Sequence, residues 1–246
     1  MKSYYESQKN NIYDVLPLTI VLDYLKDDVG DRVETFSNIM KIVEKNLDST
    51  VEQINMKLQE LQIQREKSVK SMYKFSNSMH DRQNLWLLKP TGFNRGIGIH
   101  IFNSFDQLKD IMANFYGIGR GAKDKTSIFQ THNQNHIPRE MIDQNGEKQH
   151  KNFSFVLQKL IERPMLYLQR KFDIRVWVLL NSADGKVYVY NEAYVRTSSK
   201  TYSDNITGNY EETIAMQLTN NAVQKEDPEY GKYEEGNIIS MDVLFN

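Results

Sequence analysis

The sequence contains no cysteine, which excludes disulfide bonds and thiol catalysis and is compatible with a reducing compartment. It has no apolar run long enough to cross a membrane, and residues 1–6 carry no apolar signal core. The formal net charge is −1, so no global field draws the chain to nucleic acid or to a membrane. These absences predict a soluble intracellular protein, in which any anion-binding site must be local.

Glycine and proline are both missing from Asp31 to Lys89, which predicts helix over most of that stretch. Apolar residues from Val33 to Met72 recur at mostly three- and four-residue steps, as in one long amphipathic helix or two stacked ones. A coiled coil that binds a partner is one interpretation. A helical insertion packed on its own domain is the other, and the short, irregular apolar seam favours it.

Short apolar runs indicate strands at Leu85–Leu88, Ile99–Phe102 and Phe153–Lys159. Residues 117–152 are polar and lack periodicity, which predicts a mobile loop. A further pair of strands is expected on either side of Asp184-Gly185, a dipeptide typical of tight hairpin turns. This mixture of helices and strands predicts an α+β fold.

The first strand of that hairpin carries Lys171, Asp173 and Arg175 at alternate positions, so they share one face above an apolar one. Arg196 on the second strand should lie on the same side. Cations and a carboxylate grouped in this way suit phosphate and carboxylate binding, although a solvated sheet face is the alternative.

Three other segments could contribute to a binding site. Lys89 precedes the glycine-rich residues 91–98, where main-chain amides could approach phosphate, but an ordinary hairpin would look the same. Residues 158–161 end a strand where main-chain groups could meet a purine edge, and residues 218–221 offer polar side chains that a helix cap would also explain. No metal site is predicted, because the histidines at 132 and 136 lack the Glu of a zinc-protease helix.

Taken in order, these segments resemble the tubulin-tyrosine ligase-like family. The resemblance is carried by Trp86–Pro90 with Asn94–Ile99, Gln158–Pro164, Arg170–Arg175, Tyr194–Thr197, Leu218–Asn220 with Gln224–Lys225, and Tyr233–Asn237. It implies an ATP-grasp fold, in which two α+β lobes enclose ATP. Residues 1–80 would be an N-terminal region with the helical insertion, 81–155 a central lobe with the loop 117–152, and 156–246 a C-terminal lobe that is incomplete at its end.

The resemblance also implies roles for individual residues. Lys89 would contact phosphate, Arg95 and Gly96 would lie over the nucleotide, Gln158, Lys159, Leu160 and Ile161 would frame the adenine, and Lys171, Asp173, Thr219 and Asn220 would complete the ATP pocket. Arg196 would hold the carboxylate of the added amino acid, and Arg175 would orient the acceptor.

The implied reaction adds tyrosine, glutamate or glycine to tubulin tails through an acyl phosphate, with ATP and Mg²⁺, in the cytoplasm on the cytoskeleton, a cilium or a basal body. Family members continue to a metal-binding Asp and a Glu-x-Asn pair, so the protein ligands for Mg²⁺ are expected to be absent from a chain that stops at Asn246. A catalytically inactive relative that binds acidic tubulin tails or microtubules remains an alternative, as does a coiled-coil scaffold.

Overall fold

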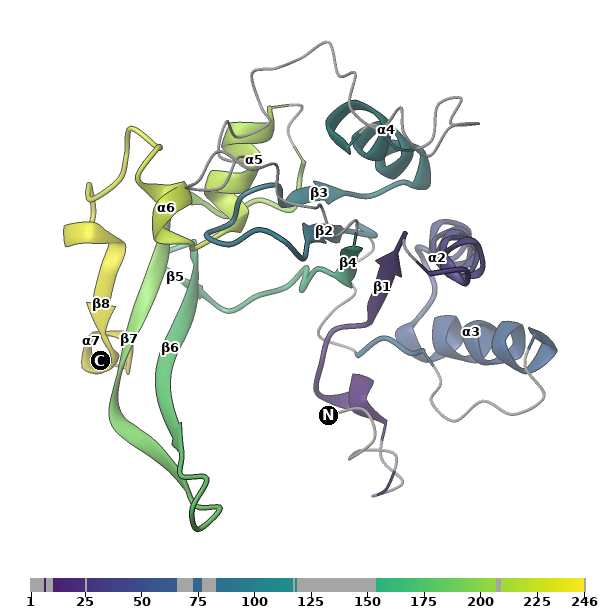
Figure 1. The fold of residues 1–246 in the computed structure, drawn as a ribbon. Coiled ribbons are helices and arrows are strands. Elements are labelled where there is room, and N and C mark those ends of the chain that lie inside the picture. The colour runs from purple at the N-terminus through teal and green to yellow at the C-terminus, as the bar shows by residue number, and fades with distance from the viewer. Residues whose placement is uncertain are drawn as a thin grey trace, which may run out of the picture. The chain divides into compact units, whose positions relative to one another are not determined.

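The computed structural model describes residues 7, 11–24, 26–65, 73–76, 83–116, 118, 154–206 and 209–245. The chain forms two compact units, Met1–Gly92 with Gly98–Arg163 and Phe93–Ile97 with Pro164–Asn246, and each is described by itself. Both combine helices with an antiparallel sheet, which confirms the α+β class (Figure 1). The division at residues 80 and 155 stays a prediction. In the described ranges no helix is both long and apolar enough to cross a membrane.

The first unit is built on a four-stranded sheet in the order β1-β4-β2-β3. Its strands are β1 (Thr19–Asp23), β2 (Trp86–Pro90), β3 (His100–Phe102) and β4 (Ser154–Lys159), and a short 3-10 helix, η1 (Ile12–Asp14), precedes them. All neighbouring strands are antiparallel. The three strands predicted in this region are confirmed, with ends that shift by one or two residues.

Helices cover one face of this sheet: α2 (Val29–Glu44), α3 (Val51–Arg65) and α4 (Phe105–Tyr116). The predicted helical stretch is thus two helices, and Phe36 of α2 and Leu58 of α3 are fully buried in a core shared with Trp86 of β2. Their apolar faces therefore pack on their own unit, as expected for a helical insertion. Residues 66–72 and, apart from Ile118, the predicted loop 117–152 lie outside the described residues.

The second unit contains a sheet in the order β5-β6-β7-β8. Its strands are β5 (Leu166–Tyr167), β6 (Arg170–Leu180), β7 (Val187–Thr201) and β8 (Ile238–Ser240), and its helices are α5 (Tyr210–Gln217), α6 (Asn221–Gln224), η4 (Glu235–Asn237) and α7 (Met241–Phe245). The predicted hairpin is confirmed. Gly185 has the positive φ of 69° that its turn requires, and its N–H donates to the Asn181 carbonyl at 2.9 Å.

Val195 of this hairpin is fully buried, but most of the apolar side chains on β6 are exposed, although strand alternation alone would suggest a core face. Ile174, Val176 and Val178 are 43%, 43% and 59% exposed, and on the opposite face Trp177 is 52% exposed. The reason is pairing: β5 reaches only the beginning of β6, and β8 pairs only with residues 194–196 of β7. The distal half is therefore a two-stranded ribbon, whose tip projects past β8 (Figure 1).

Candidate functional site

An arginine clamped by a carboxylate lies at the centre of the second unit's sheet. Asp173 of β6 stands directly opposite Arg196 of β7. The Arg196 guanidinium donates from Nε to Asp173 Oδ1 at 2.9 Å and from Nη2 to Asp173 Oδ2, so the pair is bidentate. The hydrogen bond to Asp173 raises the pKa of Arg196 and keeps it charged. This geometry fixes the plane of the guanidinium, and Nη1, which has no hydrogen-bond partner among the described residues, can donate to a ligand carboxylate.

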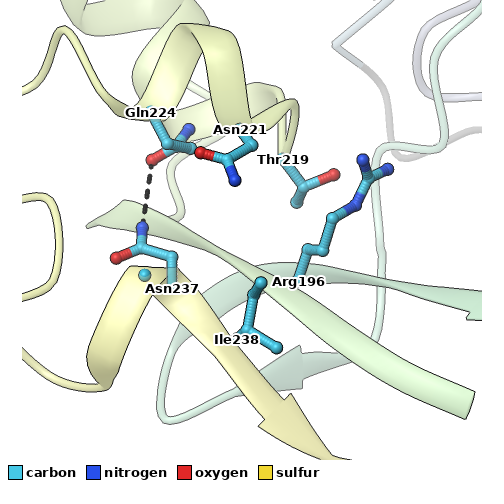
Figure 2. Close-up of a pocket in the computed structure, with 7 residues that line it drawn as sticks. Arg196, Thr219, Asn221, Gln224, Asn237 and Ile238 are labelled. Carbon is cyan, nitrogen blue, oxygen red and sulfur yellow. Dashed lines mark hydrogen bonds between the residues drawn. The ribbon is translucent and has the colours of Figure 1, made fainter.

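A small pocket adjoins this pair, and Figure 2 shows the Thr219 side chain on the same side of the pocket as the Arg196 guanidinium. The residues that line the pocket come from β7, the α5–α6 connection, α6, η4 and β8: Arg196, Thr219, Asn221, Gln224, Gly236, Asn237 and Ile238. A hydroxyl, amides and a guanidinium therefore converge within one unit. Such groups can bind an anionic or zwitterionic ligand.

Two buried amides hold the walls of this pocket together. Asn237 donates from Nδ2 to the Thr197 carbonyl at 3.2 Å and to Ser199 Oγ at 2.8 Å, and its Oδ1 accepts from the Gly231 N–H at 2.8 Å. Gln224 accepts from the Ser199 N–H at 2.5 Å and donates to the Ala215 carbonyl at 3.0 Å. The Asn237–Gln224 contact is the dashed line in Figure 2. Strand β7 is thereby tied to the segments on both sides of Thr219.

A buried ion pair secures the same end of β7. Arg170 is 2% exposed and donates to both Glu234 oxygens at 2.7 and 2.8 Å. The Thr197 hydroxyl donates to the same carboxylate, and the Arg170 guanidinium lies 4.4 Å from the Tyr233 ring centroid. Sequence reasoning gave none of Glu234, Asn237 or Gln224 a role. The only available signal was their membership of the segments that carry the family resemblance.

The glycine-rich loop contacts α6 of the second unit. Gly96 has φ of 88°, and a Cβ built on it would lie 2.7 Å from Val223 Cγ2 and 3.4 Å from Asn220 Cγ. The neighbouring Arg95 also has positive φ, at 57°, and is exposed. Only glycine fits at position 96, because any side chain would displace the loop from α6. The structure thus brings Gly96 together with Asn220, two of the predicted site residues.

Other predicted site residues gather in the first unit. Lys89 of β2 donates from Nζ to Gln158 Oε1 of β4 at 2.6 Å. Burial lowers the pKa of Lys89. Leu160 is buried, its N–H donates to the Leu85 carbonyl at 3.0 Å, and Ile161 is 38% exposed.

Lys159 differs from these neighbours because its side chain faces the core. Its Nζ donates to the Leu85 carbonyl at 2.8 Å and forms a fully buried ion pair with Glu162. Burial lowers the pKa of Lys159, and Glu162 acts in the opposite direction. Glu162 also accepts from the Leu85 N–H at 2.6 Å. The Lys159 ammonium therefore stabilises the strand end and does not point at a ligand.

The remaining predicted residues lie on β6. Arg175 is exposed opposite Tyr194, and Lys171 is half-buried near the start of the strand. For a metal ion, no group of three or more His, Cys, Asp or Glu side chains gathers among the described residues.

Comparisons of the sequence with known proteins identify a family and several relatives. The model of the Tubulin-tyrosine ligase family matches residues 24–242. The chain is 28% identical over 174 residues to Tubulin glycylase 3D of Tetrahymena thermophila, covering 69% of the chain and 13% of that protein. It is 32% identical over 145 residues to Tubulin glycylase 3B of Drosophila melanogaster, covering 58% of the chain and 14% of that protein. A Bos taurus protein named "Probable tubulin polyglutamylase" is 34% identical over 154 residues, covering 59% of the chain and 31% of that protein. The chain thus spans less than a third of the length of each of these relatives.

Proposed function

The chain belongs to the tubulin-tyrosine ligase family, and from this membership we propose that it is part of an ATP-dependent ligase that adds amino acids to tubulin C-terminal tails. The observation that carries the proposal is the Arg196–Asp173 pair beside Thr219, a fixed cation at a polar pocket. An ATP-grasp arrangement of the two units, with ATP bound by both, is part of the proposal.

The proposed reaction forms an amide in two steps. A carboxylate oxygen of the acceptor tail attacks the γ-phosphorus of ATP, which releases ADP and gives an acyl phosphate. The amine of the incoming amino acid then attacks the acyl carbon, phosphate leaves, and the amine loses a proton. No protein nucleophile is needed, so the residues act by binding and positioning charged groups.

We assign the roles as follows. Arg196 binds the carboxylate of the incoming amino acid through Nη1, because its other two nitrogens are held by Asp173. Arg175 is exposed on the same face and orients the acceptor. ATP would be bound by Lys89, Arg95, Gly96, Gln158, Lys159, Leu160, Ile161, Lys171, Asp173, Thr219 and Asn220, with Lys159 contributing main chain only, since its ammonium is buried.

Magnesium accompanies ATP in this type of reaction and neutralises phosphate charge. The described residues do not form a protein cluster for it, so no step is assigned to a protein-held metal. The partners in the proposal are a free amino acid and acidic tubulin tails or microtubules. The proposed setting is the cytoplasm on the cytoskeleton, with a cilium or basal body as particular sites.

The experiment is an incorporation assay with the purified chain, tubulin, ATP, Mg²⁺ and radiolabelled glycine, glutamate or tyrosine. We expect ATP-dependent label on tubulin with one of these amino acids. Arg196→Lys should raise the KM for that amino acid by about tenfold or more, because a point charge cannot keep both the Asp173 pair and a ligand carboxylate. The matched control is Lys186→Gln, an exposed cation at the hairpin tip of the same unit.

Two results would overturn the ligase proposal. One is a chain that binds ATP and acidic tails but incorporates none of the three amino acids, which would identify an inactive tail-binding relative. The other is incorporation that is equally insensitive to Arg196→Lys and Lys186→Gln, which would remove Arg196 from the site.

A further inference from the structure

A continuous hydrogen-bonded chain crosses three strands of the first unit's sheet. Lys89 Nζ on β2 donates to Gln158 Oε1 on β4 at 2.6 Å. Gln158 Nε2 donates to Thr19 Oγ1 on β1 at 3.0 Å, and Thr19 Oγ1 donates to the Pro17 carbonyl at 2.8 Å. The series of hydrogen bonds begins at a cation and ends at a main-chain carbonyl, so the donor and the acceptor of each bond are defined.

The chemistry of the four groups fixes that direction. An ammonium can only donate, so the Gln158 amide must present its oxygen to Lys89. Its NH₂ then faces Thr19, whose hydroxyl must accept from it and has a proton left for the Pro17 carbonyl, which can only accept. Reversing the amide would place two donors against each other at Lys89. The Thr19 hydroxyl therefore holds the Gln158 amide in the orientation that the Lys89 ammonium requires.

This series of hydrogen bonds lies on the sheet face opposite the core. Thr19 pairs directly with Gln158 in the β1–β4 register, and Leu87 and Lys89 share this face with them. Ile20, Leu157 and Leu88 alternate to the other face and are fully buried or nearly so. Lys89, Gln158 and Thr19 are all half-buried. Within the described part of the chain, Gln158 is the one hydrogen-bond acceptor of the Lys89 ammonium, which leaves two N–H bonds for a ligand.

We propose that Thr19 and the Gln158 side chain are positioning residues that hold the Lys89 ammonium in place for a phosphate group. The proposal rests on the proposed function, in which Lys89 contacts ATP, and adds to it a defined cause for the orientation of that lysine. A lysine side chain has many rotamers, and fixing its Nζ before binding lowers the entropic cost of binding phosphate. Thr19 touches no ligand in this proposal and acts only through Gln158 and Lys89.

The test is the affinity of the purified chain for two probes, ATP with Mg²⁺ and adenosine, measured by calorimetry. Thr19→Val keeps the shape of the side chain and removes the hydroxyl. We expect it to weaken ATP binding about three- to tenfold, the effect of losing one hydrogen bond, and to leave adenosine binding unchanged because adenosine has no phosphate. Thr19→Ser retains the hydroxyl and should restore ATP affinity. A purely structural role for Thr19 would reduce both affinities together.

Thr91→Val is the matched control, because the Thr91 hydroxyl also donates to a carbonyl of this sheet, that of Ser154 at 3.0 Å, and lies outside the chain of bonds. Equal ATP affinities for Thr19→Val and the wild-type chain would overturn the proposal, as would an equal loss in Thr91→Val. If Thr19→Val does not fold, Thr19→Ala decides, with the same selective loss of ATP affinity expected and an unchanged affinity contradicting it. A wild-type chain that binds no ATP would overturn the proposed function itself, and this inference with it.

Discussion

The Glu234 carboxylate shows how much one side chain can hold in place. It accepts from Nη1 and Nη2 of Arg170 and from the Thr197 hydroxyl, and its side chain is only 12% exposed. Arg170 is almost fully buried, so loss of its partner would leave a charge without compensation. The pair thus anchors the strand that carries Arg196.

The charge of Glu234 makes stability depend on pH. Burial by itself would raise the pKa of Glu234, but the hydrogen bonds from Arg170 and Thr197 outweigh it, and the pKa is lowered from 4.5. The unfolded chain therefore binds the proton more readily, and the free energy of unfolding falls as pH falls below 4.5 through the lowered value. We expect Glu234→Gln to cost about 1–3 kcal/mol at neutral pH and to reduce this acid dependence.

Urea denaturation of both proteins from pH 7 to pH 3 measures the effect. Glu235→Gln is the control, since Glu235 is the adjacent, exposed carboxylate. Parallel pH profiles for the wild type and Glu234→Gln would contradict the prediction.

At the scale of elements, the position of the α5–α6 connection depends on a buried amide. The Gln224 side chain bonds the main chain of Ser199 on β7 and the carbonyls of Ala215 and Leu218. The connection that carries Thr219 is thereby fixed against the strand that carries Arg196. Helix α6 could not hold this geometry by itself, because it is a single turn.

A comparison of two buried glutamines tests this. Gln224→Leu leaves three buried main-chain groups without their partner and should lower the free energy of unfolding by about 2–4 kcal/mol. Gln217→Leu should cost about 1 kcal/mol or less, because Gln217 Nε2 makes one bond, to the Ser203 carbonyl, and Oε1 has no partner among the described residues. Chemical denaturation measures both free energies of unfolding. Similar costs for the two substitutions would contradict the role of Gln224 in fixing the α5–α6 connection.

At the scale of the whole molecule, 31 basic and 32 acidic residues nearly cancel, so long-range attraction cannot bring an acidic tail to the protein. Under the proposed function, binding of the tail depends on local cations such as Arg175. We expect a polyglutamate peptide to bind about tenfold more weakly when ionic strength rises from 0.01 to 0.15 M, where screening shortens the Debye length to about 8 Å.

Fluorescence anisotropy with a labelled peptide measures this, and a polyglutamine peptide serves as the uncharged control. Affinity for polyglutamate that does not change with salt would argue against recognition of the tail by charge.

Local sequence signals determined much of the first unit and the hairpin of the second. Asp184-Gly185 specified the turn, and the missing glycine and proline specified helix, because these effects act over a few residues. Periodicity located the strands and separated an apolar from a charged face of β6, but it did not show that much of the apolar face would be exposed. Alternation shows that two faces differ, but it cannot show whether anything packs on either.

The candidate site itself was decided by tertiary structure. The sequence identified Lys89, Gln158, Asp173 and Arg196 as polar residues on strands, and a resemblance supplied their roles. Strand register alone paired Asp173 with Arg196, joined Lys89 through Gln158 to Thr19, and turned Lys159 into the core. A hydrogen bond between residues far apart in the chain depends on register and on which face each side chain takes, and both are set by packing of the whole sheet.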